Sequence, residues 1–343
     1  MSAVEFDAVS IVFGDLPETA LPLMDQGHSR AEIQEATGQI LGVHNCSLSV
    51  AEGEILVLMG LSGSGKSTLL RAVNGLNPVA RGEVRILDGR QMTSVTRADA
   101  ATLRGLRQRQ VAMVFQQFGL LPWRTVAENV GLGLELGAMA RTTRQAKVAE
   151  QLALVGLSQW AEHKVGELSG GMQQRVGLAR AFATDAPILL MDEPFSALDP
   201  LIRTRLQDEL LQLQQKLRRT IIFVSHDLDE AFKLGNRIAI MEGGRIVQCG
   251  TPRDIFSNPA NDYVADFVAH MNPLGVLCAR DVMEPAAGVP VENVGPEDTI
   301  QSVMEIVQTT GNPVGVVADG VLLGQVTRDT VLARLLHPQS GTT

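Results

Sequence analysis

The sequence predicts an α/β fold built on a parallel sheet, with a smaller second domain after it. Short runs rich in Val, Ile and Leu recur without polar alternation, which is typical of strands buried on both faces. Helical patterns separate these runs, as in a parallel sheet. The length of 343 residues suits about two domains. The predicted buried strands are Ile55–Met59, Val111–Phe115, Ile188–Met191, Ile221–Val224 and Ile238–Met241.

The composition is that of an ordinary globular protein, with 45% hydrophobic and 20% charged residues. Acidic residues outnumber basic ones by 38 to 29, and the net charge of −9 argues against nucleic-acid binding, which needs a basic face. Cys46, Cys249 and Cys278 show no disulfide framework. Met1–Phe13 has no basic region of a secretory signal, and no apolar stretch is long enough to span a bilayer. We therefore expect a soluble protein of the cytosol.

Other elements surround the predicted parallel sheet. Alternating polarity at Asn45–Val50 and Glu83–Leu87 predicts half-exposed antiparallel strands. Leucines at helical spacing predict a helix over Thr204–Leu217.

A segment at about 16–40 is predicted to be an insert that interrupts a pair of strands. It contains a short helix signal, in which Ser29 and Glu32 form a capping box and Gly38 ends the helix.

A second small domain is predicted at 275–337, followed by a tail at 338–343. Asn-Pro pairs mark the change of character before it. The expected order is α-β-β-α: a helix near Thr299–Gln308, a strand at Val314–Val317, a turn at Asp319–Gly320, a strand at Val321–Val326 and a helix to Leu336.

A phosphate-binding loop follows the first buried strand. The run from Gly60 to Ser67 fits G-x-x-x-x-G-K-[ST] and lies between a strand and a helix pattern, the context that this motif needs. Its glycines let backbone N–H groups face phosphate oxygens, Lys66 reaches the β- and γ-phosphates, and Ser67 ligates Mg²⁺. The predicted cofactor-binding residues here are Gly60, Leu61, Ser62, Gly63, Ser64, Gly65, Lys66, Ser67 and Thr68.

Polar residues also follow two other buried strands. Asp192 and Glu193 end the strand that begins at Ile188, and His226 follows the strand that ends at Val224. Ligands of open α/β sheets collect at this edge. Asp192 suits the Mg²⁺ shell, Glu193 is the candidate base for an attacking water, and His226 is a candidate contact to the γ-phosphate. An acid pair alone would more often be a solvated loop, but the phosphate loop upstream favours the functional interpretation.

A second anion-binding helix start lies between these motifs. In the run Leu168–Arg175, the residues Ser169, Gly170 and Gly171 begin a helix without a lysine. One nucleotide does not need two such sites in one chain, which suggests a site shared between two chains.

Together these motifs resemble those of ATP-binding cassette (ABC) ATPases, and the resemblance covers about residues 4–270. The fold it implies is an ABC ATPase domain (1–270) with an antiparallel β subdomain and a helical subdomain at about 116–165. The resemblance implies that Lys66 is the Walker A lysine, Asp192 the Walker B aspartate and Glu193 the catalytic glutamate. It implies that Gln116 is the Q-loop residue and His226 the switch histidine. It further implies that Leu168–Gln173, including Gln173, is the signature motif and that Ser196–Asp199, including Asp199, is the D-loop. Gln116 would join Ser67 and Asp192 at Mg²⁺. Phe13 lies where the family has its adenine-stacking aromatic, and a core phenylalanine is the alternative.

The same resemblance implies partners. A homodimer would close head to tail over two ATP and two Mg²⁺, with each ATP between one chain's Lys66 loop and the other chain's Ser169–Gly171. The helical subdomain would meet a separate membrane permease at the cytoplasmic face of the inner membrane. A periplasmic or lipid-anchored binding protein would deliver the substrate.

A narrower resemblance is to the ATPases of importers for quaternary amines such as glycine betaine, choline or proline betaine. It is carried by the insert end Thr37–Val43, by Leu61, and by the run Phe195–Arg203. The C-terminal unit looks like one cystathionine-β-synthase (CBS) unit where this family often has two, and its ribose-contacting T-x-x-D pattern is broken after Thr327. We therefore expect a dimer contact or a remnant there rather than a ligand sensor, and the short tail favours choline.

Alternatives differ in class. An importer ATPase for another small solute, such as an amino acid, fits the same motifs. A soluble ABC ATPase acting on chromosomes would need long heptad arms, and one acting on ribosomes would need two cassettes; neither is present. A regulatory module centred on the C-terminal unit conflicts with the complete catalytic set.

Overall fold

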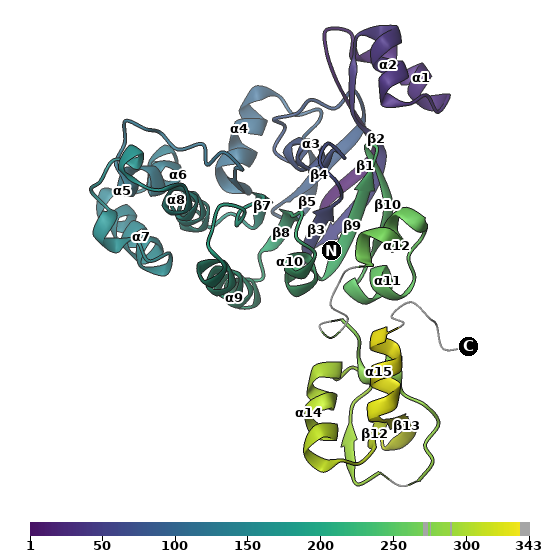
Figure 1. The fold of residues 1–343 in the computed structure, drawn as a ribbon. Helices are drawn as coiled ribbons and strands as arrows, with labels where there is room; N and C mark the ends of the chain where they lie inside the picture. Colours follow the sequence, from purple (N-terminus) through teal and green to yellow (C-terminus); the bar gives the residue numbers. More distant parts are fainter. Residues whose placement is uncertain (270–273, 275, 289, 337–343) are drawn as a thin grey trace. The chain divides into compact units, whose positions relative to one another are not determined.

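The computed structural model describes residues 1–269, 274, 276–288 and 290–336 (Figure 1). The chain divides into two compact units. The first contains Met1–His226 and Ala239–Val247, and the second contains Asp227–Ile238 and the described residues from Gln248 onward. The predicted boundaries at 270, 275 and 337 fall at or beside residues that are not described, and the predicted tail 338–343 lies outside the described part.

A six-stranded sheet forms the centre of the fold, in the order β10-β9-β3-β8-β7-β6. Strands β3, β8, β7 and β6 are parallel neighbours and buried along their whole length, which confirms the prediction from their unbroken apolar runs. The carboxyl ends of these four parallel strands therefore lie at one edge of the sheet. The bounds are β3 Ile55–Met59, β6 Val111–Val114, β7 Ile188–Asp192, β8 Thr220–Val224, β9 Arg237–Glu242 and β10 Arg245–Gly250.

A four-stranded sheet has the order β2-β1-β4-β5, and its pairs are antiparallel. Its strands are β1 Ser2–Phe13, β2 Ile40–Ala51, β4 Arg81–Asp88 and β5 Gln91–Ser94. The predicted antiparallel strands lie inside β2 and β4. Strand β2 is longer than predicted because it pairs with β1 as far as Phe13 and Ile40, at the two ends of the insert.

The insert forms a short 3₁₀ turn and two helices, α1 (Leu21–Asp25) and α2 (Arg30–Thr37), at the end of β1 and β2 (Figure 1). Its capping box is confirmed: Glu32 N–H donates to Ser29 Oγ at 3.3 Å, and Ser29 N–H donates to Glu32 Oε2 at 2.7 Å. Gly38 ends α2 in the left-handed conformation. The buried core of the insert combines Ala20, Met24 and Ile33 with Val12 of β1 and Leu41 of β2.

The remaining helices of the first unit flank the sheets or form a separate group. Helices α5, α6 and α7 pack against α8 (Figure 1). The predicted helix over 204–217 begins earlier, at Pro200, because the Asp199 side chain caps it. The bounds are α3 Lys66–Ala72, α4 Ala100–Arg109, α5 Val126–Val130, α6 Leu132–Leu136, α7 Arg141–Leu154, α8 Gly170–Ala183 and α9 Pro200–Leu217.

The second unit contains a three-stranded sheet, in which β12 pairs parallel with β11 and antiparallel with β13. The predicted α-β-β-α order is present as α14, β12, β13 and α15, and the short elements α13 and β11 were missed. Thr327 and Thr330 bond to each other at the start of α15, so Thr330 acts as the cap partner. The bounds are α10 Leu228–Leu234, α11 Pro252–Ser257, α12 Asp262–Val268, α13 Ala279–Val282, β11 Glu292–Val294, α14 Ile300–Thr310, β12 Val314–Ala318, β13 Val321–Val326 and α15 Arg328–Leu336.

Within the described residues, no helix has the length and apolar character needed to cross a membrane.

Candidate active site

The phosphate loop runs from the end of β3 to the start of α3. Two of its glycines are required by close backbone contacts. Gly60 has φ +138°, and a Cβ there would lie 2.1 Å from Met241 O. Gly65 has φ +102°, and a Cβ there would lie 2.7 Å from Gly42 O. A side chain at either position would displace neighbouring backbone, so the loop keeps the curl that faces N–H groups toward an anion.

Lys66 is buried at the first position of α3, where its ammonium is held by the loop itself. Its Nζ donates to Gly60 O and Leu61 O, both at 2.9 Å. Burial lowers the pKa of Lys66, and the charges of Glu193 and Asp192 oppose this shift. The ammonium is thus satisfied by weak neutral acceptors that a phosphate oxygen can replace.

Asp192 ends β7 with a fully buried carboxylate. Ser67 Oγ donates to its Oδ1 at 2.6 Å, and Arg71 Nη2 donates to its Oδ2 at 2.9 Å. A hydroxyl and a carboxylate side by side are oxygen ligands of the kind that Mg²⁺ prefers, so these residues fit the predicted metal. Arg71 was not among the predicted site residues, although it lies four residues after Ser67 on the same helix face.

The backbone of Glu193 has a φ of +49°, a left-handed conformation that is uncommon for residues other than glycine. Its N–H donates to Val224 O at 3.1 Å, and its carbonyl accepts from Gln174 Nε2 at 3.2 Å. The carboxylate therefore projects from the strand end. Its Oε2 accepts from Gln116 Nε2 at 3.1 Å and lies 3.5 Å from His226 Nδ1. The structure thus brings together three residues predicted to be catalytic.

Gln174 was not predicted to belong to the site, whereas its neighbour Gln173 was. Gln174 is buried, and its Oε1 accepts from Ala197 N–H at 3.0 Å, so it links α8 to Glu193 and to the predicted D-loop. Gln173 instead donates to Leu168 O at 3.0 Å and Val165 O at 3.2 Å. The local pattern does not single out Gln174, because its partners Glu193 and Ala197 lie 19 and 23 positions away in the sequence.

A cleft of about 630 Å³ opens over the loop. Phe13 lines it and is 37% exposed, so this side chain is not part of the core. The insert contributes Arg30 and Gln34 to the wall. The other lining residues are Ile40, Leu41, Gly42, Ser62, Gly63, Gly65, Lys66, Ser67, Thr68, Gln116, Glu193 and His226.

The predicted signature residues lie elsewhere on the same chain. Among the described residues that line the cleft, none belongs to Ser169–Gly171. Ser169 caps α8 by accepting from Met172 N–H at 3.4 Å, and Asp199 caps α9 by accepting from Ile202 N–H at 3.0 Å. Both residues lie at helix N-termini, and neither is among the described residues that line the cleft.

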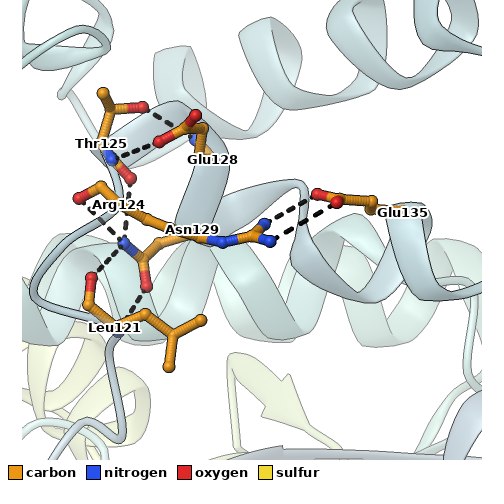
Figure 2. A network of polar contacts seen from close by, with 6 residues as sticks. All are labelled: Leu121, Arg124, Thr125, Glu128, Asn129 and Glu135. Atoms are coloured by element: carbon orange, nitrogen blue, oxygen red, sulfur yellow. Dashed lines mark hydrogen bonds and ion pairs between the residues drawn. The ribbon is translucent and has the colours of Figure 1, made fainter.

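A polar network fixes the loop between Gln116 and α5 (Figure 2). Buried Asn129 donates to Thr125 O at 2.9 Å and Leu121 O at 3.1 Å, and its Oδ1 accepts from Leu121 N–H at 2.8 Å. Thr125 and Glu128 cap α5 reciprocally, and Arg124 pairs with Glu135 at 2.7 Å. Trp123 lies in this loop, is 68% exposed and lines a groove of about 920 Å³.

Comparisons with known proteins show the family of this chain. A model described as ABC transporter matches residues 43–196. The glycine betaine/proline betaine transport system ATP-binding protein ProV of Salmonella typhimurium is 51% identical over 271 residues, which is 79% of this chain and 67% of ProV. This chain belongs to that family of ABC transporter ATP-binding proteins. It is therefore an ATPase that binds and hydrolyses ATP.

Three further proteins are similar to this chain over different shares of their length. The glycine betaine/carnitine transport ATP-binding protein GbuA of Listeria monocytogenes is 46% identical over 89% of this chain and 76% of GbuA. The trimethylamine N-oxide transport system ATP-binding protein TmoW of Ruegeria pomeroyi is 43% identical over 95% of this chain and 94% of TmoW. The dimeric ATP-binding cassette MJ0796, solved with ADP and Pi, is 32% identical with a TM-score of 0.63, covering 73% of this chain and 99% of that one.

Proposed function

We propose that this family member energises import of a small quaternary amine through a separate membrane permease. The names of its relatives support the substrate class: glycine betaine, proline betaine, carnitine and trimethylamine N-oxide all carry a nitrogen with four substituents. Choline, which the short tail favours, has the same group and stays a prediction. An amino-acid importer remains the alternative among transporters.

The observation that carries the chemistry is the position of the Glu193 carboxylate, between Gln116 Nε2 at 3.1 Å and His226 Nδ1 at 3.5 Å. In our proposal Glu193 accepts a proton from the attacking water, and Gln116 and His226 orient that water and the γ-phosphate. Ser67, Asp192 and Gln116 would hold Mg²⁺, which neutralises phosphate charge when bound. Lys66 would leave the loop carbonyls for the β- and γ-phosphates.

The proposal includes a homodimer, because the cleft of one chain has no contribution from Ser169–Gly171 among its described residues. A second chain would place these N–H groups on the γ-phosphate, and Asp199 would lie near the same contact. The dimeric solved cassette supports this arrangement.

We further propose that the permease docks at the groove beside Trp123. The groove is lined by helices α5 and α7, and the Asn129 network gives its rim a fixed shape. This rim is continuous in sequence with Gln116, so a movement of the docked permease would reach the Glu193 carboxylate through one short loop.

The substrate is tested by uptake of labelled glycine betaine, choline and trimethylamine N-oxide in cells that carry the gene, lack it, or carry only the Glu193→Gln form. Measurements at low and high osmolarity separate a nutrient importer from an osmoprotectant importer. Uptake that requires the intact gene for one of these amines supports the proposal. If no amine depends on the gene while labelled amino-acid uptake does, the substrate class is wrong and the ATPase assignment stands.

A further inference from the structure

Arg30 lies in the nucleotide cleft although it belongs to the insert and to none of the predicted motifs. It is the first residue of α2, directly after the cap Ser29. Its Nη1 donates to Gly63 O in the middle of the phosphate loop, and its Nη2 donates to Gly42 O of β2 at 2.7 Å. One guanidinium thus joins the phosphate loop to the antiparallel sheet.

The backbone around this guanidinium is packed too closely for other side chains. A Cβ on Gly244 would lie 2.8 Å from Arg30 Nη2 and 2.9 Å from Gly42 O. Gly244 N–H also donates to Ser64 O at 3.1 Å, and the Gly65 contact with Gly42 O closes the same junction. The guanidinium therefore lies in a closely packed junction between the phosphate loop, β2 and Gly244.

The charge of Arg30 has no counter-charge in the described part of the chain. No carboxylate is paired with it, and its Nε is buried without a hydrogen-bond partner. Burial lowers the pKa of Arg30, and no acidic group opposes that shift. By contrast Arg81, which contacts the insert at Asp25, donates from both of its Nη atoms to that carboxylate, at 2.7 and 2.8 Å. A partly buried cation without a partner is costly, and the phosphates of a nucleotide in this cleft would supply the missing anion.

We propose that Arg30 positions the phosphate loop and supplies a second positive charge, beside Lys66, for the phosphates of the bound nucleotide. The insert is then a working part of the nucleotide site. This inference rests on the ATPase activity of the family and is independent of which solute is transported.

The test is titration of the full chain with fluorescent mant-ATP and mant-ADP in four forms: wild type, Arg30→Met, Arg30→Lys and Arg81→Met. Met keeps the length of the side chain and removes the charge. We expect Arg30→Met to weaken binding of both nucleotides about tenfold, the loss of one charged hydrogen-bonding group. Arg30→Lys should recover part of the affinity, and added salt should weaken wild-type binding more than Arg30→Met binding.

Arg81→Met is the matched control, because it loosens the insert without touching the cleft. Its nucleotide affinity should equal that of the wild type even if its thermal unfolding temperature falls. Wild-type affinity in Arg30→Met would overturn the proposal. So would an equal loss in Arg81→Met, which would show that the insert acts only through its general stability.

Discussion

At the scale of single residues, the catalytic role proposed for Glu193 can be tested by changing one atom of its carboxylate. Replacing it by Gln keeps the size of the side chain and removes the proton acceptor beside Gln116 and His226. We expect ATP hydrolysis to fall by roughly two to four orders of magnitude while ATP binding persists. The ATP-bound dimer should then accumulate and be visible by size-exclusion chromatography. The exposed Glu162→Gln change is the control. Hydrolysis at the wild-type rate by Glu193→Gln would contradict the role.

The buried thiol of Cys46 predicts in which direction the folding stability changes with pH. Burial raises the pKa of its thiol from the usual 9.0 to about 11. The unfolded chain therefore loses this proton near pH 9, and the folded chain keeps it until about pH 11. Stability from the neutral buried thiol is complete below pH 9 and is lost as the pH rises, by up to about 1.4 kcal/mol per unit.

The measurement for Cys46 is denaturant unfolding between pH 8 and 11, compared with Cys46→Ala. The cavity left by Ala has a cost that does not change with pH, so the difference between the two forms isolates the thiol. The wild type should lose stability more steeply than Cys46→Ala above pH 9. Parallel curves would show that the thiol does not titrate differently in the folded chain.

The residues of the candidate site also differ in whether they could be predicted from the sequence. Lys66, Ser67, Asp192 and Glu193 were predictable because a local motif or a strand end identifies each. Arg71, Gln174 and Arg30 were not, because their roles come from partners 121, 19 and 33 positions away. Such contacts exist only after the sheet has assembled its edge.

At the scale of elements, the insert is a small structure with well-defined ends. Ser29 and Glu32 cap α2, and Gly38 ends it at φ +69°. We expect Ser29→Ala and Gly38→Ala each to cost about 1 kcal/mol, from a lost cap hydrogen bond and from a strained left-handed residue. Hydrogen exchange of the α2 amides measures this locally, with exposed Glu35→Ala as the control. Exchange as slow as in the wild type in both variants would show that the caps do not hold the helix.

Strands were predicted correctly where the sequence has an unbroken run of apolar residues. The strands β3, β7 and β8 are buried on both faces, so their apolar runs marked them clearly. Strand β11 has only three residues, two of them exposed, and exists because it pairs with β12. Helix α1 was missed for a similar reason, since it is five residues long and depends on the insert core around Met24.

At the scale of the whole molecule, two helix N-termini of the chain are suited to binding one anion, but only one of them lines the cleft among the described residues. Lys66 begins α3 inside the cleft, whereas the N-terminus of α8, at Ser169–Gly171, does not line it among the described residues. A symmetric head-to-tail dimer is the simplest arrangement that uses both, because it pairs each start with the other start of a second copy.

This arrangement predicts complementation between two inactive variants. Lys66→Ala removes the charge from one half of each site, and Ser169→Arg blocks the other half. Each variant alone should be unable to hydrolyse ATP, because both of its sites are damaged. In an equimolar mixture, a mixed dimer has one doubly damaged site and one intact site, so about a quarter of wild-type activity should return if intact sites act singly. Dimer formation with ATP should return with it. If neither activity nor dimer formation recovers in the mixture, each site is not assembled from two chains, and the role given to Ser169 is wrong.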